Sequence, residues 1–71
     1  MQSLLNQFES LKSGNIIKFK DSNIEYTLIE NRIGDHLFFK NRFDSTKMFH
    51  LFYDEISQET DTFTIIGNNY E

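Results

Sequence analysis

The sequence predicts an α+β domain: an N-terminal helix followed by a five-stranded antiparallel meander, either open or curled into a small SH3-like or OB-like barrel. Two observations lead to it. Apolar and aromatic side chains alternate with polar ones through most of residues 15–53, which is typical of half-buried strands. Clusters of Asp, Ser, Asn and Gly interrupt the alternation, and these residue types form tight turns. We therefore expect strands at about 15–20, 24–31, 35–42, 47–53 and 62–66.

The turns at residues 20–23, 31–34 and 44–46 predict how the strands pair. With those turn lengths, apolar side chains of neighbouring strands meet on one face, and Glu25 lies between two lysines on the other. A slip of one residue would scatter both sets, so the pattern favours this register. The predicted rows are Ile17–Tyr26–Phe39–Leu51 and Leu28–Leu37–Tyr53 on one face, and Lys18–Glu25–Lys40–His50 on the other.

Residues 3–13 predict an amphipathic helix. Leu4, Phe8 and Leu11 recur at helical spacing, and Gly14 is placed to end the helix in a left-handed conformation. The second sheet face should carry a further row that is too apolar to leave in water. We expect the helix to lie across that row or, in a closed barrel, to plug one end. The row is Ile16, Thr27, Phe38 and Phe52.

One segment, residues 47–56, also fits a helix. The apolar face of that helix would hold Met48, Leu51, Phe52 and Ile56. We favour a strand over 47–53, because its aromatic density and the register both agree with one. Residues 54–61 then form an acidic connection before the last strand.

Length and composition set the remaining bounds. A chain of 71 residues makes one domain with a thin core, to which its eight phenylalanines contribute much of the apolar area. There is no cysteine and no apolar run long enough to span a membrane, so we expect a soluble, cytoplasmic protein. The strong use of Asn, Ile and Phe, without Ala, Val or Pro, is typical of an AT-rich genome. It suggests a phage or mobile element, and hence the host cytoplasm.

Residues suited to catalysis or metal binding are few. His36 and His50 are the only two histidines, and no third ligand accompanies them. Gly14 and Gly34 are isolated, so there is no phosphate-binding loop. We therefore expect no catalytic residue, no metal and no cofactor.

The charges suggest a first function. Every Lys and Arg lies between residues 12 and 47, whereas only acids follow. An acidic end of this kind could occupy a basic groove on another protein. The first hypothesis is therefore a non-catalytic protein-binding module, such as a phage-type inhibitor of a host protein. Solubility alone would also explain the acids. The candidate residues are Asp54, Glu55, Glu59 and Asp61.

A second function follows from basic residues interleaved with aromatics. Cations that track phosphates and rings that stack on bases are typical of single-stranded nucleic-acid binders, and a small nucleotide would use the same groups. The net charge of −4 argues against this reading, as does a helix covering the phenylalanines. The candidates are Lys18, Phe38, Lys40, Arg42, His50 and Phe52. A third hypothesis is a structural subunit of a homo-oligomer.

Overall fold

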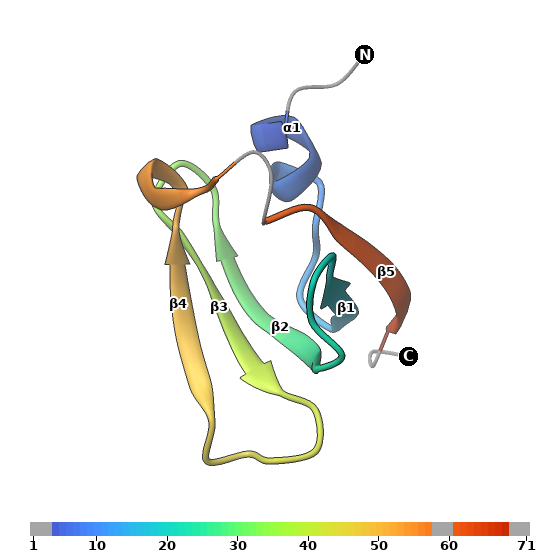
Figure 1. Ribbon diagram of the computed structural model, residues 1–71. Coiled ribbons are helices and arrows are strands. Elements are labelled where there is room, and N and C mark those ends of the chain that lie inside the picture. Colours follow the sequence, from blue (N-terminus) through green and yellow to red (C-terminus); the bar gives the residue numbers. More distant parts are fainter. Residues whose placement is uncertain (1–3, 58–60, 69–71) are drawn as a thin grey trace.

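Five antiparallel strands form one sheet, with a short helix packed against one face, in the residues that the computed structural model describes, 4–57 and 61–68 (Figure 1). The predicted α+β class, with an N-terminal helix before an antiparallel sheet, is confirmed. The strand predicted near 47–53 is also confirmed over its helical alternative. The elements are α1 (Leu4–Glu9), β1 (Asn15–Phe19), β2 (Glu25–Arg32), β3 (His36–Asn41), β4 (Met48–Phe52), the 3₁₀ turn η1 (Tyr53–Glu55) and β5 (Phe63–Asn68).

The strand order is β4-β3-β2-β1-β5, so only the first four strands form a meander. The last strand returns across the sheet and pairs with β1, where the N–H of Lys20 donates to the carbonyl of Thr62 at 2.8 Å. The prediction of a five-stranded meander is wrong in this respect. The barrel alternative is also wrong, because β4 and β5 lie at opposite edges of an open sheet (Figure 1).

The pairing of β1 with β2 is confirmed, but the pairing of β2 with β3 differs from the prediction. Leu28 lies opposite Phe39 rather than Leu37. The reason is twofold: the closing turn is residues 33–35, and the register shifts at a bulge that contains Ile29. A shift of two residues at Leu28 preserves which side chains face the core, although it changes the rows.

The pairing of β3 with β4 is also shifted by two residues. Phe39 lies opposite Phe49, not Leu51. The connecting loop is longer than the predicted three-residue turn, because β3 ends at Asn41 and β4 begins at Met48. The N–H of Asn41 donates to the carbonyl of Lys47 at 2.8 Å and closes the loop. Side chains again keep their predicted face.

The helix covers the face opposite to the one we predicted. Its Phe8 is fully buried, and it packs with strand residues that alternate toward the same side. We call this side the closed face. The buried core is Phe8, Leu11, Ile17, Leu28, Leu37 and Phe39. The predicted placement of the helix over Phe38 and Phe52 is therefore wrong.

The helix is also shorter than predicted, since it ends at Glu9. The side-chain amide of Asn31 donates to the carbonyls of Phe8 and Leu11, at 3.1 and 2.9 Å, and so satisfies groups that a longer helix would have used itself. Leu11 then turns into the core. Gly14 has the expected positive φ of 94°, but it lies at the entry to β1 rather than at the end of the helix.

Asn31 owes its position to the bulge at Ile29. The extra residue reverses the alternation, so Asn31 lies opposite Leu37 on the closed face. There its amide oxygen accepts a hydrogen bond of 2.7 Å from the hydroxyl of Tyr53. One side chain thus joins α1, β2 and η1 at the same end of the sheet.

Candidate functional site

The side of the sheet away from α1 carries exposed apolar and aromatic side chains, and we call it the open face. Its β1–β2 half is covered, because Ile16 and Thr27 are buried. Its β3–β4 half is exposed: Met48 and Phe52 keep 54% and 42% of their accessible surface. The strand residues on this side alternate with those that face α1. His36, Phe38 and Lys40 on β3 are half-buried, whereas Met48, His50 and Phe52 on β4 are exposed.

Four of these rings form what we call the aromatic–histidine cluster: His36, Phe38, His50 and Phe52. Phe38 and His50 are directly opposite across β3 and β4, with ring centroids 4.5 Å apart and ring planes 14° from parallel. The rings of His36 and His50 meet at 5.0 Å, and those of His36 and Phe52 at 5.6 Å. The sequence predicted His50 beside Lys40, but Lys40 lies opposite Met48.

The closest ring pair determines what this surface can offer to a ligand. Two parallel rings cannot approach to 4.5 Å side by side, so Phe38 and His50 overlap face to face. Each ring has therefore already covered one of its own faces with the other. The cluster presents ring edges and a partly exposed Phe52 rather than a row of flat stacking platforms.

One of the cations on the open face is already paired with a carboxylate, so fewer are available to a ligand than the sequence suggests. Arg42 forms an ion pair with Glu25, with Nη1 and Oε1 2.6 Å apart, and its N–H also donates to the Glu25 carbonyl. Glu25 thus lies beside Lys18 and Arg42, not between the two predicted lysines. Within the described ranges, Lys18 and Lys40 have no ion pair.

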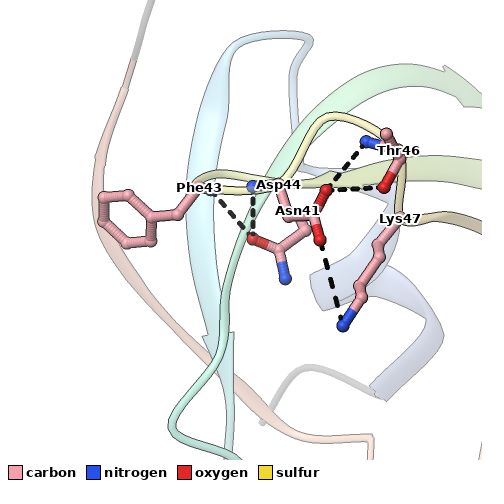
Figure 2. Close-up of polar contacts among 5 residues, drawn as sticks. All are labelled: Asn41, Phe43, Asp44, Thr46 and Lys47. Carbon is pink, nitrogen blue, oxygen red and sulfur yellow. Dashed lines mark hydrogen bonds and ion pairs between the residues drawn. The ribbon is translucent and has the colours of Figure 1, made fainter.

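The β3–β4 loop is held by its own polar side chains (Figure 2). The side-chain oxygen of Asn41 accepts hydrogen bonds from the N–H groups of Phe43 and Asp44, at 2.8 and 3.1 Å. Asp44 in turn accepts bonds from the hydroxyl and N–H of Thr46, at 2.6 and 3.1 Å, and lies 3.9 Å from the Lys47 ammonium. The bonds from Thr46 lower the pKa of Asp44.

Three members of this surface were missing from the sequence-based candidates. Phe43 is 77% exposed and points away from the polar contacts of the loop (Figure 2). The Arg42 guanidinium lies 5.2 Å from the Phe43 ring centroid. Met48 and His36 belong to the open face itself. The alternation of β3 and β4 already placed Met48 and His36 on this side. The exposure of Phe43 had no sequence signal, because it depends on the loop.

Three of the four acidic candidates lie in the part of the chain that the structure describes. Asp54 and Glu55 are exposed on η1. Asp61 is part of a turn: its carboxylate accepts a hydrogen bond from the N–H of Ser57, and its own N–H donates to the Ser57 carbonyl at 3.2 Å. Glu59 lies outside the described residues.

Both histidines contact neighbouring side chains. His36 Nδ1 lies 2.8 Å from a carboxylate oxygen of Asp35, and His50 is held by its ring contacts. In the part of the chain that the structure describes, no group of three or more His, Asp or Glu could hold a metal ion.

Fold and site together define a small α+β domain with one covered and one open sheet face. Comparison with family models, with curated proteins and with solved structures found no match to this chain. Among the described residues, no helix has the length and apolar character needed to cross a membrane.

Proposed function

We propose that this chain is a non-catalytic protein-binding module that engages its partner through the open face. The observation that carries the proposal is the exposed β3–β4 half of that face, where Phe52 and Met48 retain about half of their surface in water. Aromatic residues, Met and Arg are the residue types enriched at the cores of protein interfaces.

The polar groups around this surface also suit a protein partner. Lys40 lies next to the aromatic–histidine cluster on β3, and Lys18 lies farther along the same face on β1, where the two would form part of a charged rim. Phe43 projects from a loop that its own hydrogen bonds preorganise. An aromatic side chain held in place before binding loses little entropy when it enters a pocket on a partner.

Nucleic acid is the weaker alternative for the same face. Base stacking needs open ring faces, and Phe38 and His50 have each covered one ring face with the other. Phosphate binding needs free cations, yet Arg42 is already paired with Glu25 in a chain of net charge −4. The narrower role suggested by the composition, a phage-type inhibitor of a host protein, remains a prediction.

The test is an affinity capture from host lysate with two matched variants. Phe52→Ser removes an apolar side chain that is 42% exposed on the open face, and Ile65→Ser removes one that is 51% exposed on β5. A protein that survives nuclease treatment should be retained by wild type and Ile65→Ser and lost with Phe52→Ser. Retention by Phe52→Ser would overturn the proposed face, and loss on nuclease treatment would favour nucleic acid.

A further variant tests the acidic end against the open face. Asp54→Asn with Glu55→Gln removes two exposed charges and leaves the hydrogen-bonded Asp61 intact. If the open face carries binding, affinity for the captured protein should change little. A marked slowing of association would assign the interface to the acids instead.

A further inference from the structure

We infer that the free edge of β4 pairs antiparallel with β4 of a second copy of this chain, so that two sheets join and their open faces become one surface. This inference does not depend on the proposed function, because it is argued from the backbone groups of the edge, although Met48 and Phe52 contribute side chains to both surfaces.

The edge has unpaired backbone groups in a regular series. In antiparallel pairs, residues alternate between those that exchange hydrogen bonds with the neighbour and those that point away. The N–H of Tyr53 donates to the Asp35 carbonyl, and the N–H of Asn41 donates to the Lys47 carbonyl. The backbone N–H and C=O groups of the odd-numbered residues of β4 therefore point toward β3. The N–H and C=O groups of Met48 and His50, and the N–H of Phe52, therefore point outward.

Nothing within this strand blocks another strand from pairing. Native edge strands are usually protected by charges, by proline or by a bulge. The β4 sequence Met-Phe-His-Leu-Phe contains no proline, lysine, arginine or carboxylate, and its register with β3 is regular. The opposite edge differs: β5 contains Gly67 and shifts register against β1.

Antiparallel pairing about His50 makes the strand complementary to itself. His50 then lies opposite His50 of the second copy, and Met48 lies opposite Phe52 of that copy. In this register the N–H of each His50 meets the carbonyl of the other His50, and the N–H of each Phe52 meets the carbonyl of Met48 in the other copy. The two most exposed apolar side chains of β4 meet across the junction, where a thioether and an aromatic ring attract one another.

The charges at the two ends of β4 favour a second copy over an unrelated strand. Lys47 precedes the strand; its side chain is 73% exposed and lies 3.9 Å from the Asp44 carboxylate, a contact in water that leaves it open to a second partner, and Asp54 and Glu55 follow the strand. Antiparallel pairing brings the basic end of one strand alongside the acidic end of the other, whereas parallel pairing would place like charges together. The separation of basic and acidic residues along the sequence thus favours antiparallel pairing of two copies.

The first experiment uses the absence of cysteine from the chain. Directly opposite, hydrogen-bonded residues have Cα atoms about 5.5 Å apart, which is within the roughly 4.4–6.8 Å range of a disulfide. His50→Cys should therefore convert to a disulfide-linked dimer under mild oxidation. Met48→Cys is the control, since its two copies would lie about 13 Å apart or more. Equal rates for the two variants would overturn the register.

The second experiment tests pairing without a cross-link, by sedimentation velocity over increasing protein concentration. The wild-type chain should show a concentration-dependent monomer–dimer equilibrium. Met48→Lys with Phe52→Glu should keep that dimer, because the new charges lie opposite each other across the junction. Met48→Lys with Phe52→Lys should lose it. A wild-type chain that stays monomeric throughout, or two double variants that behave alike, would overturn the inference.

Discussion

Phe38 and Phe39 are neighbours in one strand, yet they belong to different environments. Phe39 is fully buried on the closed face, among Phe8, Ile17 and Leu28. Phe38 lies on the open face, where it is half-buried and stacks on His50. The two residues are chemically identical, so the difference between them comes only from which face the helix covers.

The comparison shows that this small sheet concentrates its stability on one side. The closed face holds six buried apolar residues, together with the Asn31 hydrogen bonds that join α1, β2 and η1. The open face holds ion pairs and ring contacts that remain in water. An exposed aromatic surface contributes little to folding, and this is why we assign it to binding.

The largest expected effect comes from truncating the two phenylalanines separately. Phe39→Ala should lower the free energy of unfolding by about 3–5 kcal/mol, because it leaves a cavity in the core. Phe38→Ala should cost about 1 kcal/mol, the value of a partly exposed ring pair. Urea denaturation measures both, with Phe39→Leu as a milder variant if the alanine protein does not fold. Similar losses at the two positions would contradict the division into faces.

The loss of a polar contact should also lower the free energy of unfolding more on the closed face than on the open face. Asn31→Ala should cost about 1–3 kcal/mol, since it leaves the Leu11 carbonyl without its donor in a half-buried site, while the Phe8 carbonyl keeps only the N–H of Leu11. Arg42→Ala breaks the shorter contact with Glu25, but in water it should cost only about 0–1 kcal/mol. The measurement is again urea denaturation. A larger loss for Arg42→Ala would show that the open face contributes to folding.

The smallest effect is a pH dependence on the closed face. Burial raises the pKa of the Tyr53 phenol above its ordinary value of 10.0, against the effect of its hydrogen bond to Asn31. The folded chain therefore keeps this proton longer than the unfolded chain. Its contribution to stability is complete below about pH 10 and is lost as the pH rises through the folded pKa.

Comparing wild type with Tyr53→Phe isolates this contribution. The stability advantage of wild type, which includes the Tyr53–Asn31 bond, should shrink between about pH 9 and pH 11. Thermal or urea unfolding at several pH values measures it. Curves that run parallel through this range would mean that the phenol titrates alike in the folded and unfolded chains.

Much of the fold could be predicted, because alternation is a local property. It correctly assigned the strands and placed Ile17, Leu28 and Phe39 together on one face. The predicted cross-strand rows were wrong where the register depends on a turn, a bulge or a loop rather than on the alternation. The turn at residues 33–35 and the bulge at Ile29 together shifted the β2–β3 register by two residues, and the loop held by the Asn41 and Asp44 side chains accompanies a shift of two residues between β3 and β4.

The membership of the candidate site was predicted in part, because His36, Phe43 and Met48 were missing from the candidates. The structure places all six basic and aromatic candidates, Lys18, Phe38, Lys40, Arg42, His50 and Phe52, on the open face. The sequence could not show that Arg42 would be paired with Glu25, or that Phe38 would stack on His50. Both contacts depend on the true register.

By itself, the sequence determined the class of fold, the strands and which side chains share a face, because each follows from residue spacing along the chain. Only the tertiary structure decided which face is covered and where β5 pairs. Both faces of β3 carry a phenylalanine, so hydrophobicity could not choose between them. The choice came from Asn31, which the bulge turned toward α1 and whose amide holds the carbonyls of Phe8 and Leu11. The helix was thereby joined to one side of the sheet, and Phe38 and Phe52 were left on the other.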